Sequence, residues 1–322
     1  PSFFYKALFS QLILGVGFGS IAMYFLSRLD YHILQKFAPW IFLLGLFITL
    51  LVFVPGLTLE HGGAKRWISL GFISFQPSEF LKLSFVLYLS AWLSSEKPSF
   101  NHWKKSLLPF SIFLVIPALV LLAQPDTDSL LIITAAALAM YFIAGAKWRH
   151  IGLFVLSLLI GLAILVASRP YLLDRIKTFV DPSIDPLGSS YQITQSVMSV
   201  GSGQITGRGF GQSIQKFNYL PEPTGDSIFA IISEEFGFLG SLTLVILYLG
   251  FVVRGLRISM RAPDKFGSLL ALGFVTLIGA QSFLNIMAII GIFPLTGLPL
   301  IFVSHGGTAL FLALCSVGII LN

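Results

Sequence analysis

Apolar runs long enough to cross a bilayer recur along this chain, and they limit its possible folds more than any other feature. A membrane-spanning helix needs roughly 17–25 predominantly apolar residues. Because lipid offers no hydrogen bonds, the spanning segments must be helices and not open strands. The sequence therefore predicts an all-α polytopic membrane protein. Nine transmembrane helices are expected, at about 8–26, 38–54, 79–94, 107–123, 129–146, 151–168, 227–252, 267–290 and 299–320.

Low charge content agrees with this class, since only 11% of the 322 residues are charged, whereas a soluble domain carries about 25%. The formal net charge of +6 does not indicate nucleic-acid binding, because no basic run is interleaved with aromatic residues. The one cysteine, Cys315, lies in the last apolar run, which excludes an internal disulfide framework and a thiolate metal cluster. The sequence also contains no HExxH motif, nucleophile elbow or Cys/His cluster.

Basic residues collect in every second connection between the expected spans. Short loops rich in lysine and arginine face the cytoplasm, so these connections are predicted to be cytoplasmic. The resulting topology places Pro1 outside, and we expect a tenth span upstream of this sequence. The eleven basic residues are Arg28, Lys36, Lys97, Lys104, Lys105, Lys147, Arg149, Arg254, Arg257, Arg261 and Lys265.

One outer connection, residues 169–226, is far longer than the others, and such loops are usually functional. Within it, SSYQITQSVMSV has the spacing of a helix that lies on the membrane or on the bundle. The following GSGQITGRGFGQS has five glycines in eleven residues. It is either a tight turn that brings backbone N–H groups near an anion or a flexible loop, and it lacks the Gly-Lys-Ser/Thr ending of a P-loop.

Polar residues gather near the outer ends of the spans. Lys65 and Arg66 precede Trp67, which is typical either of an interfacial anchor or of a phosphate-binding segment. Glu79 and Lys82 are spaced i, i+3 on one helix face, where they form either a structural ion pair or a functional pair inside the membrane.

Further polar residues have simpler structural explanations. Of Asp126 and Asp128, one is explained by the dipole of the helix that follows. Gln281 and Asn285, at i, i+4, suit hydrogen bonds to neighbouring helices. His305 is better explained as a structural histidine than as a metal ligand.

The stretch NYLPEPTGDSIFAIISEEFGFLG holds four carboxylates in this apolar chain. Glu222 and Asp226 precede an apolar run, whereas Glu234 and Glu235 lie inside it. For the latter two we favour a buried structural role.

Six segments resemble, in the same order along the chain, the hallmark segments of the SEDS family, which includes FtsW, RodA and SpoVE. The resemblance runs from Phe3 to the last residue, and SIQKFNYLPEP is more similar to FtsW than to RodA. The segments are GAKRWISLG, FQPSEFLKL, QPD, DPLGSSYQITQS, GSGQITGRGFGQSIQKFNYLPEPTGDSIFAIISEEFGFLG and GIFPLTGLPLIFVSHGGTAL.

The resemblance implies that residues 1–322 form one integral-membrane domain of a ten-span protein with cytoplasmic termini. It further implies a peptidoglycan glycosyltransferase that polymerises lipid II on the outer face of the bacterial cytoplasmic membrane, for cell division or cell shape. Lipid II is a disaccharide-pentapeptide on undecaprenyl pyrophosphate. The implied partners are lipid II, the growing glycan chain, a class B penicillin-binding protein that cross-links the glycan, and other divisome or elongasome proteins.

The resemblance also carries the family's essential acid onto Asp226, aligned through Pro221-Glu222 and Phe229-Ala230. Residues around this acid depart from the family pattern, which bears on catalytic efficiency more than on the identity of the acid. The departures are Thr224, Gly225, Ser227, Ile301, His305 and the segment QPDTDS.

A mechanism follows from the implied substrate. Lipid II is α-linked and the glycan is β-1,4-linked, so the displacement inverts and requires one general base. Asp226 is expected to be either that base or a ligand of a divalent cation such as Mg²⁺ or Mn²⁺. No dedicated metal site is assigned. The residues expected to bind substrate are Lys65, Arg66, Trp67, Glu79, Lys82, Asp126, Arg208, Lys216, Glu222 and Ser304.

Two other functions compete with the enzyme. A scaffold of the division machinery that has lost catalysis is favoured by the altered TGDS segment and opposed by the retained Asp226. A lipid II flippase would also have intramembrane charges such as Glu79 and Lys82. Transporters often carry inverted repeats, however, and no repeat is present here.

Overall fold

The computed structural model describes residues 8–61, 64–69, 74–95, 100, 102–185, 188, 190–217 and 219–322, and for 59–61, 64, 65 and 69 it describes the backbone alone. The chain forms two compact units. The first consists of Pro1–Phe154, Val252–Ala280 and Gly306–Asn322, and the second consists of Val155–Phe251 and Gln281–His305.

Helices dominate the described part of the chain, and each of the nine expected apolar runs contains one, which confirms a polytopic helical membrane protein. Six helical segments are long and apolar enough to cross a membrane: Phe9–Leu26, Tyr31–Phe53, Trp103–Ala123, Trp148–Ser168, Ile228–Arg261 and Lys265–Ile289. They contain the π-helical Phe9–Phe18 with α2 (Gly19–Leu26), α3 (Tyr31–Leu50), α5 (Leu107–Ala123), α7 (Trp148–Ser168), α10 (Ile228–Arg261) and α11 (Lys265–Ile289). Two shorter apolar helices are α6 (Thr127–Ile143) and α12 (Gly307–Ile320). The helix α4 (Pro77–Ser94) also lies in an expected apolar run.

Some helix ends differ from the prediction, for local reasons. α3 begins at Tyr31, earlier than expected, because the Asp30 carboxylate accepts a hydrogen bond from the His32 N–H at 3.0 Å and caps the helix. α10 continues to Arg261, past the predicted end at 252. α12 begins only at Gly307, so the expected span at 299–320 was wrong in its first part, which is not helical.

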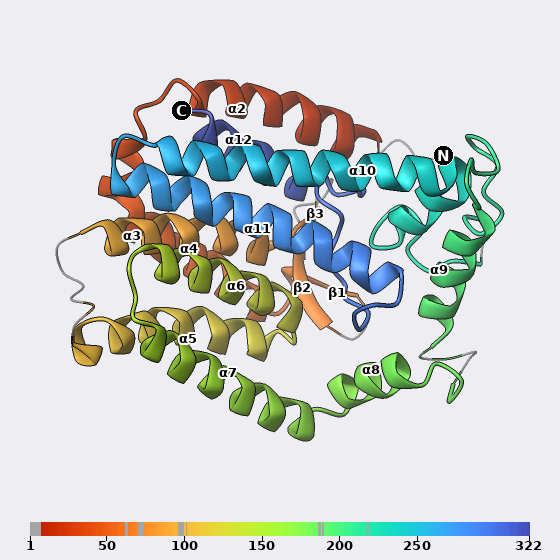
Figure 1. Ribbon diagram of the computed structural model, residues 1–322, viewed down its shortest axis with the longest axis horizontal. Helices are drawn as coiled ribbons and strands as arrows, with labels where there is room; N and C mark the ends of the chain where they lie inside the picture. The colour runs from red at the N-terminus through yellow and green to blue at the C-terminus, as the bar shows by residue number, and fades with distance from the viewer. Residues whose placement is uncertain are drawn as a thin grey trace. The chain divides into compact units, whose positions relative to one another are not determined.

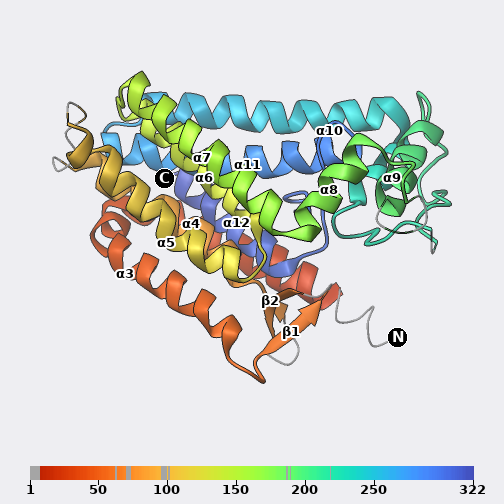
Figure 2. The same cartoon turned by 90° about the horizontal axis from the view of Figure 1, so that it is seen from below.

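In the first unit, α4 is the central helix. Most of its residues are buried on every side, including both polar and apolar positions, as expected for a helix inside a bundle. It packs against α3, α5 and α6, which lie beside it in both views (Figures 1 and 2). α12 lies along α2 in the same unit.

A small antiparallel sheet in the first unit was not predicted. It has the order β1-β2-β3, with β1 at Thr58–His61, β2 at Ala64–Ser69 and β3 at Ser74–Phe75. Leu59 pairs with Trp67, and Ile68 pairs with Phe75. The expectation that this chain forms only helices is therefore wrong for the segment between α3 and α4, where the strands are too short to span a membrane.

The long connection 169–226 lies within the second unit. That connection is not a structureless loop, because it forms α8 (Pro170–Val180) and α9 (Tyr191–Ser202), the latter as predicted. The unit closes around a cluster of buried apolar side chains from the end of the connection, from α10 and α11, and from the segment after α11. The buried members are Leu220, Phe229, Ala230, Ile231, Tyr248, Ile286, Ile289 and Leu300.

Candidate functional site

Asp226 lies in a compact turn that immediately precedes α10. The carbonyl of Glu222 accepts hydrogen bonds from the N–H groups of Gly225 at 3.1 Å and Ser227 at 3.2 Å. The Ser227 hydroxyl closes the turn by donating to the carbonyl of Pro221 at 2.9 Å. Asp226 is partly buried in this turn.

Asn285 of α11 fixes the backbone of the acid itself. Its side-chain amide donates to the carbonyl of Asp226 at 2.8 Å and to the carbonyl of Leu298 at 2.7 Å. The sequence predicts that Asn285 and Gln281 bond to neighbouring helices. In the structure both amides donate to carbonyls of non-helical segments, Gln281 to that of Pro299 at 3.2 Å. Carbonyls of irregular backbone have no hydrogen-bond donor within a helix, and these buried side-chain amides supply the missing donors.

Ser304 and His305 hold the same turn from the segment that leads into α12. The Ser304 hydroxyl donates to the carbonyl of Gly225 at 2.7 Å and accepts from the Leu300 N–H at 2.8 Å. The His305 N–H donates to the carbonyl of Thr224 at 2.8 Å, while the residue as a whole is exposed. The structural role of His305 therefore comes from its backbone.

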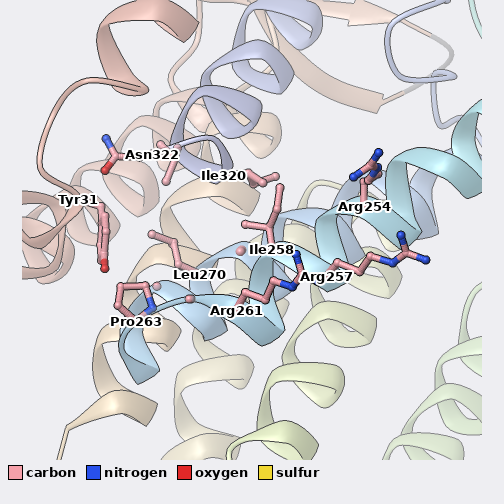
Figure 3. Close-up of a pocket in the computed structure, with 13 residues that line it drawn as sticks. Tyr31, Arg254, Arg257, Ile258, Arg261, Pro263, Leu270, Ile320 and Asn322 are labelled. Atoms are coloured by element: carbon pink, nitrogen blue, oxygen red, sulfur yellow. The ribbon is translucent and has the colours of Figure 1, made fainter.

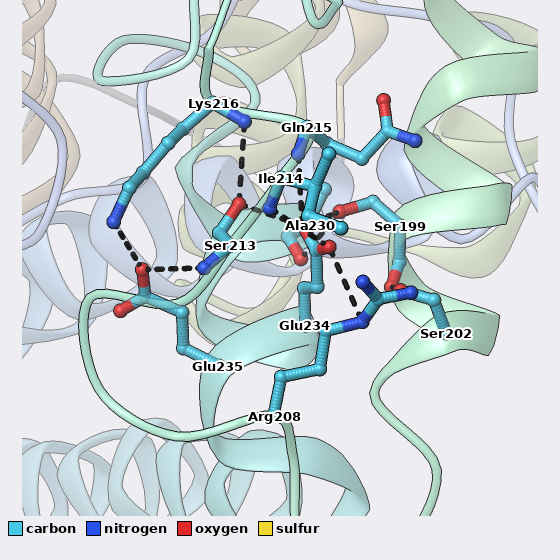
Figure 4. A network of polar contacts seen from close by, with 10 residues as sticks. All are labelled: Ser199, Ser202, Arg208, Ser213, Ile214, Gln215, Lys216, Ala230, Glu234 and Glu235. Atoms are coloured by element: carbon cyan, nitrogen blue, oxygen red, sulfur yellow. Dashed lines mark hydrogen bonds and ion pairs between the residues drawn. The ribbon is translucent and has the colours of Figure 1, made fainter.

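Glu234 is fully buried in α10 and accepts hydrogen bonds from several directions (Figure 4). The anion that the glycine-rich segment meets is therefore a carboxylate of the protein itself. Its donors are the hydroxyls of Ser199 at 3.3 Å and Ser213 at 2.6 Å, the N–H groups of Ile214 at 3.2 Å and Gln215 at 3.4 Å, and Arg208 Nε at 3.5 Å.

Glu235 is the second buried carboxylate of this network (Figure 4). It accepts from Lys216 Nζ at 2.7 Å and from the Ser213 N–H at 3.4 Å. The buried structural role predicted for Glu234 and Glu235 is confirmed. Arg208 and Lys216, expected to bind substrate, are thus ion-paired within the protein.

The glycine-rich segment and the break in α10 form one backbone arrangement. Gly237 has φ 65° and ψ −162°, which interrupts the helix. The opened carbonyls of Glu234 and Glu235 accept from the N–H groups of Arg208 at 3.0 Å and Gly209 at 2.9 Å. A Cβ on Gly207 would lie 2.1 Å from the Glu235 carbonyl oxygen, so only glycine allows this approach. The segment therefore forms a tight turn, in which the N–H groups of Arg208 and Gly209 bond to carbonyls of α10.

The remaining candidate residues belong to the first unit. Glu79 and Lys82 form the predicted i, i+3 ion pair at 2.8 Å, and both are buried in α4. Arg66 of β2 donates through Nε to the carbonyl of Gln124 at 3.5 Å and through its guanidinium to the carbonyl of Pro125. Arg66 therefore holds the connection that leads into α6.

Asp126 follows directly on this connection and caps α6. One of its oxygens accepts from the Ser129 N–H at 3.2 Å, which confirms a role at the helix N-terminus. The other oxygen, Oδ2, is buried without a hydrogen-bond partner among the described residues. Trp67 is partly buried in β2, and the side chain of Lys65 lies outside the described residues.

The structure thus brings the candidates together in two groups, one in each unit. Lys65, Arg66, Trp67, Glu79, Lys82 and Asp126 belong to the first unit, and Arg208, Lys216, Glu222, Asp226 and Ser304 belong to the second. Sequence reasoning missed the hydroxyl donors Ser199 of α9 and Ser213, because single serines carry no distinguishing pattern.

Carboxylates suitable for a divalent cation occur on the Asp226 turn. Glu222 lies on the same turn. Gly225 directly precedes Asp226 in the chain, and a Cβ built on Gly225 would lie 3.3 Å from Oε2 of Glu222. Among the described residues there is no group of three or more His, Cys, Asp or Glu that could hold a metal ion. Mg²⁺ commonly binds through one or two carboxylates together with substrate phosphates, and two acids on one turn fit that mode.

Comparison with known proteins places this chain among relatives of similar length. Stage V sporulation protein E of Bacillus subtilis (strain 168) is 39% identical over 329 aligned positions, which cover 100% of this chain and 87% of the relative. A probable peptidoglycan glycosyltransferase FtsW of Geobacter sp. (strain M18) is 38% identical, with 94% of this chain and 83% of the relative covered.

Solved structures agree with these relatives. RodA of Thermus thermophilus matches with a TM-score of 0.71 and 26% identity, over 98% of this chain and 86% of that chain. A second structure, described as the structural coordination of polymerization and crosslinking by a peptidoglycan synthase complex, matches with a TM-score of 0.81 and 28% identity, over 98% and 88%. The family model for the cell cycle proteins FtsW, RodA and SpoVE matches residues 3–322. This chain therefore belongs to the FtsW/RodA/SpoVE family.

Proposed function

We propose that this chain is a peptidoglycan glycosyltransferase that polymerises lipid II into β-1,4 glycan on the outer face of the cytoplasmic membrane. Family membership and the names of relatives such as the Geobacter FtsW support the activity. The observation that carries the proposal is the fixed turn around Asp226. Three successive carbonyls, of Thr224, Gly225 and Asp226, are each held by a separate donor.

Asp226 acts as the general base in this proposal. It takes the proton from the attacking 4-hydroxyl of one sugar while that oxygen forms a bond to the anomeric carbon of the other. The bond from the anomeric carbon to the pyrophosphate oxygen breaks, and the electron pair leaves with the pyrophosphate. Because one displacement occurs, the configuration inverts and no covalent intermediate forms. A fixed backbone favours this role, since a base must be held within hydrogen-bond reach of its proton.

The departing pyrophosphate needs positive charge, not a proton. The candidate contributors in this proposal are Lys65, Arg66, Lys82, Arg208 and Lys216. Three of these cations already have a carboxylate partner, since Lys82 is paired with Glu79, Arg208 with Glu234 and Lys216 with Glu235. In the alternative role of Asp226, it would hold a divalent cation together with Glu222, and that cation would supply charge to the pyrophosphate in place of a general base.

Finer features of topology and assembly belong to the same proposal. All nine apolar helical runs cross the membrane, with α8, α9 and the Asp226 turn on the outer side. A class B penicillin-binding protein is the proposed partner. The match to a synthase complex that coordinates polymerization and crosslinking supports such an assembly.

A polymerisation assay with labelled lipid II tests the function. The full-length protein is purified with its penicillin-binding partner, and products are separated as glycan ladders, with and without Mg²⁺. Asp226→Asn is compared with wild type and with Asp174→Asn, which removes an exposed carboxylate of α8. We expect ladders from wild type and Asp174→Asn and none from Asp226→Asn.

Other results would select another function or another residue. If a folded wild-type complex forms no ladder, the scaffold gains support, and movement of lipid II across vesicles would indicate the flippase. Ladders from Asp226→Asn at the wild-type rate would mean that another acid or the partner catalyses the transfer.

A further inference from the structure

A cavity of about 510 Å³ lies at the ends of helices in the first unit, away from every residue assigned above. Its lining comes from the beginning of α3, the end of α10, the beginning of α11 and the end of α12. This volume is within the range of about 300–1,000 Å³ that small-molecule sites occupy. The cavity is large enough for a lipid headgroup.

Three arginines of α10 line the cavity. Arg254, Arg257 and Arg261 are spaced i, i+3, i+7, which places them along one face of the helix (Figure 3). All three are exposed, and none has a hydrogen bond or an ion pair with any residue that the structure describes. Arg208 is different, because it is paired with Glu234. The cavity therefore presents positive charge that the described part of the protein does not neutralise.

The acid nearest in sequence is already used elsewhere. Asp264 accepts hydrogen bonds from the Tyr31 hydroxyl and from the N–H groups of Phe266 at 3.0 Å and Gly267 at 3.3 Å. It therefore caps α11 and joins it to the start of α3. This leaves the charge of the three arginines available to a ligand.

The cavity also has an apolar side. Figure 3 shows Ile258, Leu270 and Ile320 between the arginines and the pair Tyr31 and Asn322. Both α10 and α11 have the length and apolarity of membrane spans, so their ends lie near the level of the lipid headgroups. One connection of the expected topology contains Arg254, Arg257 and Arg261. The distribution of basic residues assigns that connection to the cytoplasm.

We propose that this cavity binds an anionic phospholipid of the cytoplasmic leaflet, with the phosphodiester between the arginines and acyl carbons against the apolar side chains. Guanidinium groups match phosphate oxygens in both charge and hydrogen-bond geometry. Basic pockets between membrane helices on the cytoplasmic side are suited to such headgroups. The apolar side favours a lipid over a free phosphate ester, which would leave that surface uncovered.

Direct binding measurements with the purified full-length protein test the proposal. Native mass spectrometry would titrate short-chain phosphatidylglycerol, short-chain phosphatidylcholine and glycerol 3-phosphate. The variant Arg254→Gln/Arg257→Gln/Arg261→Gln is compared with Lys105→Gln/Lys147→Gln/Arg149→Gln, which removes the same charge from exposed positions outside the cavity. A separate variant, Ile258→Glu, introduces a carboxylate beside the arginines.

Phosphatidylglycerol is expected to bind wild type and the control variant equally. Its affinity for the cavity variant should fall by about a hundredfold, because each of the three basic residues near an anionic lipid contributes a factor of roughly five. Ile258→Glu should also weaken it. Phosphatidylcholine should bind weakly throughout, as should glycerol 3-phosphate.

Several results would overturn the proposal. Equal losses in both triple variants would indicate general surface charge. Equal binding of phosphatidylcholine would remove the role of the arginines, and equal binding of glycerol 3-phosphate would identify a phosphate-ester site. If wild type binds neither lipid but binds a polyglutamate peptide, the occupant is an acidic protein segment.

Discussion

At the scale of single residues, Glu234 shows how a buried charge is retained in this protein. The side chain has no exposed surface, yet serine hydroxyls, backbone N–H groups and Arg208 all point toward its oxygens. A buried charge is tolerated only when it is paired and hydrogen-bonded. Removing the carboxylate would take this acceptor away from the buried hydroxyls of Ser199 and Ser213.

Glu234→Ala is therefore expected to lower the stability of the folded protein by about 1–3 kcal/mol, the usual cost of leaving buried hydrogen-bond donors without a partner. Thermal unfolding in detergent would measure the effect as a lowered midpoint. Asp174→Ala removes an exposed acid and serves as the control, with little change expected. Equal midpoints for wild type and Glu234→Ala would show that the network contributes no net stability.

Ser304 acts on the proposed reaction through the position of the Asp226 turn. Ser304→Ala deletes the hydrogen bonds to Gly225 and from Leu300, at a cost of about 1–2 kcal/mol. We expect kcat to fall several-fold while KM changes little, and Ser304→Thr to recover part of the loss by restoring a hydroxyl. Ser316→Ala, which removes another buried hydroxyl bonded within α12, is the matched control. A change confined to KM would argue for direct substrate contact instead.

At the scale of elements, the break in α10 depends on the backbone of the glycine-rich segment. Phe238 and Leu239, just past the break, donate to the carbonyls of Gln204 at 2.8 Å and Ile205 at 3.1 Å. Together with the bonds from Arg208 and Gly209, these contacts satisfy groups that a continuous helix would pair internally. Backbone hydrogen bonds therefore join α10, at its interruption, to the segment that follows α9.

Two glycines of this segment allow the junction to be tested with matched variants. Gly207 and Gly211 have nearly the same φ, 81° and 80°. An added Cβ would meet the Glu235 carbonyl oxygen at 2.1 Å in the first case and nothing within 4 Å in the second. Gly207→Ala should therefore open the segment to limited proteolysis and lower the unfolding midpoint far more than Gly211→Ala. Equal effects would mean that positive φ alone is responsible, at about 1 kcal/mol in each variant.

Local sequence patterns predicted the helices and short-range pairs of this structure, but they did not predict contacts between residues that are distant in the chain. α4, α9 and the Glu79–Lys82 pair follow from periodicity within a few residues. The pairing of Arg208 with Glu234 joins residues far apart in the chain, and no local pattern specifies it. The strands β1 and β2 were missed because their residues also suit an interfacial anchor.

At the scale of the whole molecule, the arrangement of basic residues gives the chain a predicted direction across the membrane. The connection with α8, α9 and the Asp226 turn should face outward, whereas the end of α10 should face the cytoplasm. This direction is essential to both proposals, because lipid II is polymerised outside and the arginine cavity is assigned to the inner leaflet.

Cysteine labelling tests this direction without other cysteines interfering. Cys315 is the only cysteine in the sequence and is buried, so Cys315→Ala provides a cysteine-free chain. In that chain, Phe210→Cys and Met260→Cys place single thiols at positions that are 83% and 76% exposed. A membrane-impermeable maleimide should label Phe210→Cys in spheroplasts and Met260→Cys only after permeabilisation. The reverse pattern would move the Asp226 turn to the cytoplasm, where polymerisation of outward-facing lipid II by this residue is impossible.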